Sequence, residues 1–284
     1  MQLGIVSPIV TANPGAHAPW EEHAGIAELV QVAQAADRLG FHHLTCSEHV
    51  AVPAEAADLR GGTYWDPLAT FGHLAAVTAQ LRLMTQVLVI GYHHPLAIAK
   101  RYGTLDLVSG GRLMLGIGVG SLEEEFALLG APFAGRGERA DDALRALRAS
   151  LGRREPSYHG THYDFDGLVV EPHAVQERVP LLIGGRTARS LRRAVELGDG
   201  WVPFGLGLDE LRTMLAGRDL PAGFEVILSP GRMVDPIGDP SGTTSRLARV
   251  RDAGATLVTT AVEATSADHY CDQLEALAVL AKEI

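Results

Sequence analysis

The stretch "LRLMTQVLVIGYHHPLAIAKRYGTLDLVSGGRLMLGIG", residues 81–118, holds two largely apolar runs with a helical segment between them. The runs at 81–90 and 112–117 show no alternation of apolar and polar residues, which is typical of strands covered on both faces. Residues 95–109 predict the intervening helix. A strand, a helix and a strand in this order indicate two parallel strands joined by a right-handed crossover.

The same alternation of strand and helix extends along the rest of the chain. Predicted strands lie at 2–7, 42–47, 81–90, 112–117, 179–185, 200–204, 224–230 and 256–262. Predicted helices lie at 21–39, 66–79, 95–109, 138–151, 187–197, 208–216, 243–253 and 267–282. Asp66 and Pro67 are suited to begin one of these helices, and Gly40 to end another. Eight such units predict an α/β fold, the (β/α)8 TIM barrel.

We expect residues 1–284 to form a single domain, since barrels of roughly 250 residues fold as one unit. One interval breaks the regular spacing. The segment 122–180 is inserted after the fourth strand and contains the helix predicted at 138–151 and a β-like segment at 157–172. A loop of this length is typical of a lid over a site or of a stabilising appendage. We expect it to cover part of a substrate pocket.

Composition excludes several classes of partner. The net charge of −10 and the scattered basic residues argue against binding to nucleic acid or to an acidic membrane surface. No apolar run reaches the ~20 residues of a membrane span, and the first residues do not resemble a signal peptide. The isolated cysteines, Cys46 and Cys271, suit a reducing compartment. We therefore expect a cytoplasmic protein that acts on a small molecule.

In such a barrel the active site lies where the strands end. Glu48 and His49 follow the second strand, and "GIGVGS", 116–121, ends the fourth. The latter departs from the dinucleotide-binding fingerprint at Ser121 and predicts either close backbone packing or a glycine floor under a flat ring. "IGGRT", 183–187, precedes a helix, whose free N–H groups bind anions. It predicts a phosphate site or a tight turn with a surface arginine.

Histidines are the candidates for metal binding and for proton transfer. They are His42, His43, His49, His93 and His94. None of them has the spacing of a known metal site, so we expect no metal. His49 follows its strand and should lie at the catalytic face, either as a proton-transfer group or as a histidine hydrogen-bonded within its loop.

Longer segments resemble one family, the luciferase-like flavin and deazaflavin oxidoreductases. The resemblance covers roughly residues 35–203 and is most specific over Pro95–Gly120, with the pattern A-K-x-x-x-T-L-D-x-x-S-G-G-R-x-x-L-G-x-G-x-G. Within the family, the chain is most similar to the subgroup that uses coenzyme F420, a 5-deazaflavin. The resemblance implies that His49 lies over the reactive ring and that Glu48 is the acid beside it. It also implies that Gln86-Val87 is a non-prolyl cis peptide in a bulge behind the ring.

The resemblance implies further cofactor contacts. Those to the ring would come from Gly118, Val119 and Gly120, and those to the phosphate of the tail from Gly184, Gly185, Arg186 and Thr187. The chain departs from the family pattern at two positions. His93 stands where relatives often have arginine, and Ser121 stands where sugar-phosphate-oxidising relatives have a catalytic glutamate. The second departure weakens any assignment of their substrate to this chain.

The function implied is hydride transfer between F420 and a small organic substrate. In this hypothesis His49 exchanges the accompanying proton, with its pKa tuned by a carboxylate such as Glu48. An FMN-dependent monooxygenase that receives reduced flavin from a reductase partner is one alternative, and a non-catalytic cofactor-binding barrel is another. The apolar surfaces of the helices predicted at 66–79 and 95–109 suggest a homodimer, as in relatives.

Overall fold

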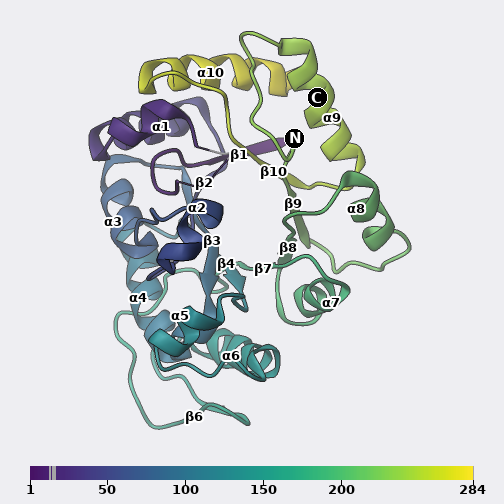
Figure 1. The fold of residues 1–284 in the computed structure, drawn as a ribbon. Coiled ribbons are helices and arrows are strands. Elements are labelled where there is room, and N and C mark those ends of the chain that lie inside the picture. Colours follow the sequence, from purple (N-terminus) through teal and green to yellow (C-terminus); the bar gives the residue numbers. More distant parts are fainter. Residues whose placement is uncertain (13, 15–16, 284) are drawn as a thin grey trace.

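Eight parallel strands form a closed barrel in the computed structural model, which describes residues 1–12, 14 and 17–283 (Figure 1). The strands are β1 (Gln2–Val6), β2 (His43–Cys46), β3 (Arg82–Val89), β4 (Leu113–Gly118), β7 (Leu181–Gly184), β8 (Gly200–Val202), β9 (Glu225–Leu228) and β10 (Leu257–Thr260). They follow one another around the barrel in chain order, and β10 pairs with β1 to close it. The prediction of a (β/α)8 barrel is therefore confirmed.

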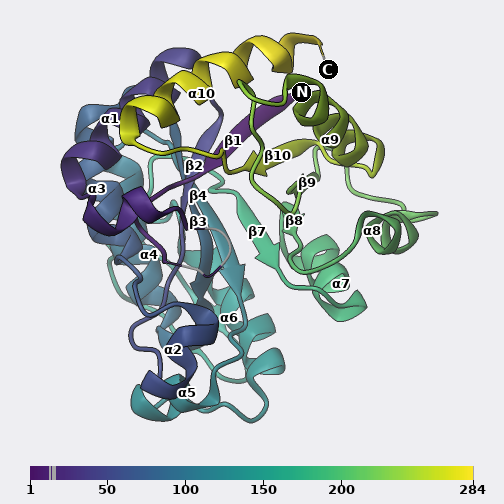
Figure 2. The same ribbon diagram turned by 45° about the horizontal axis from the view of Figure 1, so that its top comes forward.

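Helices follow each strand and cover the outside of the barrel. They are α1 (Ile26–Leu39), α3 (Pro67–Val77), α4 (Pro95–Val108), α6 (Arg136–Ser150), α7 (Ala188–Leu197), α8 (Leu208–Leu215), α9 (Pro240–Asp252) and α10 (Ala267–Leu280). Figures 1 and 2 show α10 lying against α1, so the last helix meets the first. No helix of the described residues is both long and apolar enough to cross a membrane.

Local sequence signals explain where the helices begin and end. The Asp66 carboxylate accepts a hydrogen bond from Ala69 N at the start of α3, and Gly40 ends α1 with a φ of 78°. The helix predicted from residue 21 begins later than expected. A short 3-10 turn, η1 (Pro19–His23), comes first, and α1 starts after Gly25, whose N–H donates to the Glu28 carboxylate at 2.8 Å.

Two apolar layers hold the barrel together. One buried cluster consists of Met84, Met114, Leu182, Val202, Ile227 and Leu257, each from a different strand. Leu83, Leu113 and Ile183, their neighbours in sequence, belong instead to the larger cluster shared with the helices. Because side chains of a strand point to alternate faces, the first cluster fills the barrel and the second fills the space between sheet and helices.

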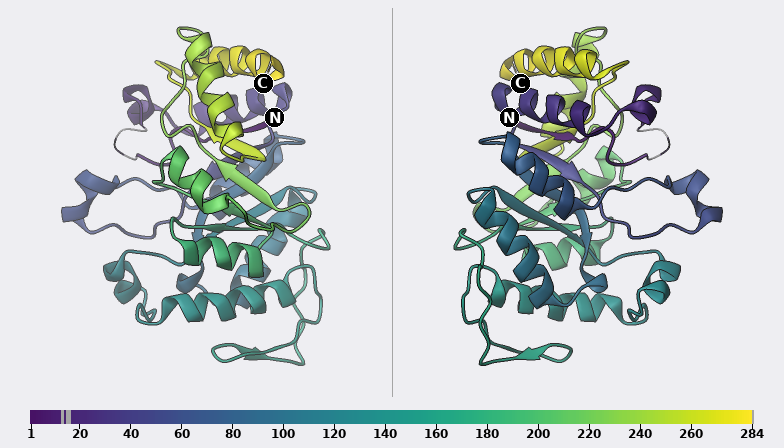
Figure 3. Two further views of the ribbon diagram at one scale, coloured as in Figure 1. Left: turned by 90° about the vertical axis from the view of Figure 1, so that its right-hand side faces the viewer. Right: turned by 90° about the vertical axis from the view of Figure 1, so that its left-hand side faces the viewer.

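The insertion after β4 has two parts. The first contains a short helix, α5 (Glu123–Leu128), and α6, which is the barrel helix of this unit. The second contains a hairpin, β5 (Tyr158–His159) and β6 (Asp164–Phe165), at the edge of the molecule (Figure 3). Asp142 on α6 holds the hairpin, because its carboxylate accepts hydrogen bonds from Tyr158 Oη at 2.5 Å and His162 N at 2.6 Å.

Short helices that the sequence did not predict lie in two loops on the side where the strands end. They are α2 (Ala54–Arg60), between β2 and α3, and α5. Figures 2 and 3 show both projecting from the same side of the barrel. A further 3-10 turn, η2 (Ile90–Tyr92), follows β3, and η3 (Ala281–Glu283) follows α10.

Candidate active site

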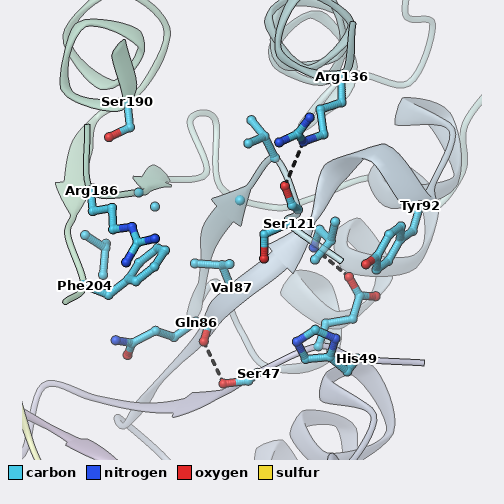
Figure 4. Close-up of a pocket in the computed structure, with 18 of the residues that line it drawn as sticks. Ser47, His49, Gln86, Val87, Tyr92, Ser121, Arg136, Arg186, Ser190 and Phe204 are labelled. Atoms are coloured by element: carbon cyan, nitrogen blue, oxygen red, sulfur yellow. Dashed lines mark hydrogen bonds between the residues drawn. The ribbon is translucent and has the colours of Figure 1, made fainter. Parts of the chain in front are cut away.

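A cavity of about 690 Å³ opens where the barrel strands end (Figure 4). The residues predicted for the site all line it: Glu48, His49, Gln86, Val87, Gly118, Val119, Gly120, Gly184, Gly185, Arg186 and Thr187. They come from the ends of four strands, so the barrel brings together residues that are far apart in sequence.

His49 is paired with a carboxylate from the insertion. Its Nδ1 lies 2.7 Å from Oε2 of Glu125, a residue of α5 that is 1% exposed. Among the described residues nothing hydrogen-bonds to Nε2, the other ring nitrogen of His49. An ionised carboxylate on Nδ1 keeps the proton there when the ring is neutral, so Nε2 is free to accept a proton.

Glu125 is held in its ionised form by four donors. Tyr92 Oη lies 2.6 Å from Oε2, and the backbone N–H groups of Val50 and Ala51 donate to Oε1 at 2.6 and 3.2 Å. Burial alone would raise the pKa of Glu125, but the hydrogen bonds from Tyr92, His49 and Val50 outweigh it and lower this pKa. Burial and the bond to Glu125 raise the pKa of the Tyr92 phenol, so Tyr92 remains the donor.

Glu48 has a different partner from the one expected. From the sequence, the role of Glu48 is open between tuning His49, holding the ring and capping the loop. In the structure its Oε1 lies 2.7 Å from Nε2 of His93, and its Oε2 accepts from Val89 N at 2.7 Å. The carboxylate is nearly buried and faces the end of β3 rather than the imidazole of His49. The carboxylate that contacts His49 is therefore Glu125 and not Glu48.

The end of β3 forms one wall of the cavity. The Gln86–Val87 peptide is cis, and the pairing of β3 with β4 shifts between Thr85 and Leu88, as the resemblance implied. Val87 lies between two glycines of neighbouring strands. A Cβ on Gly118 would lie 2.6 Å from Val87 Cγ2, and one on Gly184 would lie 2.9 Å from Val87 Cγ1, so neither position has room for a side chain.

Gln86 carries an unused polar atom on this wall. It lines the cavity, and its Oε1 is buried without a hydrogen-bond partner among the described residues. A buried acceptor of this kind costs stability unless a partner reaches it. Flavin and deazaflavin rings present both N–H and C=O groups along one edge. The wall therefore fits a flat heterocycle, which Val87 and Gln86 would contact.

The amino terminus of α7 forms the other end of the cavity. Thr187 caps this helix, since its Oγ1 accepts from Ser190 N at 3.2 Å, while the N–H groups of the first two helical residues have no partner within the helix. Gly185 adopts a φ of 137° in this turn. The dipole and free N–H groups of such a terminus favour an anion.

Arginines surround this end of the cavity. Arg186 and Arg189 line it and take part in none of the ion pairs found among the described residues. Arg193 is buried and paired with Asp141, and Arg136, at the start of α6, donates from Nε to Gly120 O at 3.0 Å. Arg186 lies beside Phe204 in Figure 4. In a chain with a net charge of −10, this local excess of positive charge suits a phosphate group.

The remaining histidines lie outside the cavity. His43 is buried near the start of its strand with Nε2 at 2.8 Å from Thr259 Oγ1, and burial lowers its pKa to about 3. His42 packs edge-on against His43, and His94 caps α4 by accepting from Leu96 N. No group of three His, Cys, Asp or Glu residues suited to a metal ion occurs in the described part of the chain.

Several lining residues were missed by reasoning from sequence. They include Tyr64, Tyr92, Arg136 and Phe204. The buried Glu125, which contacts His49 and Tyr92, was also missed. Tyr64 packs edge-on against His49, with ring centroids 4.5 Å apart. Of the insertion, only Arg136 and Gly137 line the cavity among the described residues, so the expected cover over the pocket is limited to the start of α6.

Two proteins of related sequence are similar to this chain over most of its length. An uncharacterised protein of Mycobacterium tuberculosis is 30% identical over 267 residues, which cover 87% of this chain and 91% of that protein. The oxygenase component of a flavin-dependent trigonelline monooxygenase from Acinetobacter baylyi is 27% identical over 193 residues, which cover 66% of this chain and 51% of that protein.

Solved structures share the fold. The monooxygenase RslO1 from Streptomyces bottropensis superposes with a TM-score of 0.76 at 21% identity, covering 100% of this chain and 99% of its own. An F420-dependent secondary alcohol dehydrogenase, solved with an F420-acetone adduct, gives a TM-score of 0.71 at 14% identity, covering 97% of this chain and 98% of its own. The sequence profile of the luciferase-like monooxygenases matches residues 1–220, and this chain therefore belongs to that family.

Proposed function

We propose that this protein is an oxidoreductase that binds coenzyme F420 and transfers a hydride between the deazaflavin and a small organic substrate. One observation carries the proposal. A single cavity extends from His49, backed by Glu125, to the glycine-rich amino terminus of α7. A cofactor with a redox-active ring at one end and a phosphate on its tail needs both environments in one continuous space.

When bound, a deazaflavin supplies two-electron hydride transfer, and the residues of the cavity supply orientation and proton exchange. His49 Nε2 gives or takes the proton that accompanies the hydride. Glu125 stabilises the imidazolium that forms, because its ionised oxygen accepts from Nδ1 at 2.7 Å. Val87 and Gln86 orient the ring, and Arg186 and the first N–H groups of α7 hold the phosphate.

The choice of F420 rests on the pattern over Pro95–Gly120, which resembles the F420-using subgroup, and on the F420-dependent dehydrogenase that shares the fold. A second candidate is an FMN-dependent monooxygenase, which the flavin-dependent trigonelline monooxygenase relative supports. Both cofactors have a flat ring and a phosphate, so the cavity accommodates the chemistry of either. The two candidates differ in which cofactor binds tightly and in whether oxygen is a reactant.

Titration with each cofactor separates the candidates. Purified protein is mixed with F420 and, separately, with FMN, and the dissociation constant is measured from the change in cofactor fluorescence. We expect F420 to bind more tightly than FMN. Tighter binding of FMN would favour the monooxygenase, and binding of neither cofactor would overturn both candidates and favour a non-catalytic barrel.

Substitution of His49 tests its assigned role. We expect His49→Ala to bind F420 with nearly the parent affinity and to reduce the rate of hydride transfer by about 100-fold, the lower range for a lost acid–base group. The matched control is His159→Ala, which removes an exposed histidine of the β5–β6 hairpin. An unchanged rate and pH profile in His49→Ala would remove His49 from proton transfer.

A further inference from the structure

We infer that Glu48 is a positioning residue. Its carboxylate fixes the irregular end of β3 and thereby holds Val87 in place as the surface on which the ring lies. The inference rests on the proposed function only in taking a cofactor ring as the occupant of that surface. The contacts of Glu48, Ser47 and His93 carry the argument.

Residues at the end of β2 hold the irregular segment 86–89 by three hydrogen bonds. Ser47 Oγ donates to Gln86 O at 2.7 Å, and Glu48 N donates to Val87 O at 3.3 Å. Val89 N donates to Glu48 Oε2 at 2.7 Å. The regular pairing of β2 with β3 ends at Cys46 and Thr85, so these bonds continue the contact between the two strands where the ladder stops.

Val87 transmits any movement of this segment to the cavity. Its two methyl groups occupy the spaces left by the missing side chains of Gly118 on β4 and Gly184 on β7. Both glycines and Val87 line the cavity. A shift of the segment therefore changes the shape of the wall, because the methyl groups have close neighbours on both sides.

Both carboxylate oxygens of Glu48 already have partners. Oε2 binds the backbone of Val89, and Oε1 lies 2.7 Å from His93 Nε2. The residue is 7% exposed, whereas His49 keeps Nε2 free of protein partners among the described residues. The two neighbours in sequence therefore have separate tasks: His49 exchanges a proton, and Glu48 shapes the surface beneath the ring.

The test compares Glu48→Ala with Glu48→Gln in two measurements. In the cofactor-free protein, NMR nuclear Overhauser effects report the contacts of the Val87 methyl groups with the α-protons of Gly118 and Gly184. A fluorescence titration with F420 and with FMN then measures cofactor affinity. Glutamine keeps an oxygen for Val89 N and an amide group for His93, so it is the conservative variant. Asp142→Ala is the control, because it removes a carboxylate remote from the cavity.

We expect Glu48→Ala to lose or weaken the Val87 contacts and to raise the dissociation constant of the cofactor about tenfold, which corresponds to about 1.4 kcal/mol. Glu48→Gln and Asp142→Ala should keep the Val87 contacts and the parent affinity. If Glu48→Ala does not fold, Glu48→Asp replaces it, since the shorter side chain cannot keep both the bond to Val89 N and the contact with His93 Nε2.

Parent-like Val87 contacts in Glu48→Ala, or in Glu48→Asp where that variant replaces it, would overturn the inference. A parent protein that binds neither cofactor would overturn the proposed function instead. The NMR comparison would still decide whether Glu48 positions Val87, so the two failures are distinguishable.

Discussion

In the proposed mechanism, Glu125 is the side chain that supports proton exchange by His49. Its carboxylate joins His49 and Tyr92 to the backbone of the loop after β2. In Glu125→Gln, the side-chain shape is retained but the charge that stabilises a protonated His49 is lost. We expect the rate of hydride transfer to fall by about tenfold to 100-fold. Affinity for F420 should change little, since Glu125 does not line the cavity.

Stopped-flow absorbance of the reduced and oxidised cofactor gives this rate, and Glu123→Gln is the control. Glu123 belongs to the same helix but is exposed. Equal loss of rate in the two variants would point to a general effect of charge on α5. A loss confined to Glu125→Gln would support the role of the buried pair.

Glu125 also makes stability depend on pH. Its pKa is lowered from 4.5 in the folded protein, so its ionised form contributes stability that is fully present above pH 4.5. This contribution is lost as the pH falls through the folded pKa, because the protonated carboxyl no longer accepts from all four donors. Urea unfolding at pH 7 and at steps below 4.5 measures the difference between the parent and Glu125→Gln. We expect that difference to shrink as the pH falls, and a constant difference would contradict the assignment.

The contact of Glu125 with His49 could not be predicted from the sequence, for a physical reason. Three consecutive glutamates, Glu123 to Glu125, are typical of a solvent-exposed first turn of a helix, and two of them are exposed. Glu125 is separated from His49 by 76 positions in the chain. Local patterns predict which strand end a residue follows, so His49 could be placed. They do not predict which side chain from a neighbouring loop will meet it.

Among the secondary-structure elements, those that bury a continuous apolar surface were predictable. The eight barrel strands and their helices belong to this group. α2 was not predicted because none of its residues is buried, and α5 was not predicted because it has only six residues. The pairing of His49 with Glu125, and of His93 with Glu48, was not predictable either. It depends on how the loops pack rather than on local periodicity.

Arg112, the arginine of the "SGGR" part of the family pattern, binds carbonyl groups near the ends of two helices. Its buried guanidinium donates to the carbonyl oxygens of Ala75 and Ser109, near the ends of α3 and α4, at 2.7 and 2.6 Å. It also donates to Thr78 Oγ1 and Leu81 O. We expect Arg112→Lys to lower the free energy of unfolding by about 3 kcal/mol, because an ammonium group cannot reach these acceptors together. Urea unfolding measures the loss, and Arg101→Lys on the exposed side of α4 should change stability little.

The positive charge beside the amino terminus of α7 should contribute to the affinity for F420. We expect Arg186→Ala to raise the dissociation constant of F420 about tenfold. The dependence of affinity on salt should become weaker, since one charge that attracts the anionic tail is removed. Fluorescence titration at several salt concentrations measures both effects. Arg192→Ala, on the helix that follows Arg186, is the control, since Arg192 is exposed and is not part of the cavity lining. Equal effects of the two variants would indicate only a general influence of net charge.

For the molecule as a whole, we propose a homodimer formed through α3 and α4. The exposed residues of α3 are Ala69, Gly72, His73 and Ala76, which share one helical face that has no Asp, Glu, Lys or Arg. Leu107 and Val108 are exposed at the end of the neighbouring helix α4. A second copy that covered this surface would remove it from water, which is the main source of stability in dimer interfaces.

Sedimentation velocity of the parent and of Ala76→Arg tests the dimer. We expect the parent to sediment as a dimer and Ala76→Arg as a monomer, because a long charged side chain on the buried face cannot be solvated in the interface. Val279→Arg introduces the same side chain at an exposed position of α10, away from α3, and should remain dimeric. A monomeric parent would refute the proposal, and dissociation of both variants would place the interface elsewhere. Since the cavity is lined by residues of one chain, a monomeric Ala76→Arg should still bind F420 with the parent affinity.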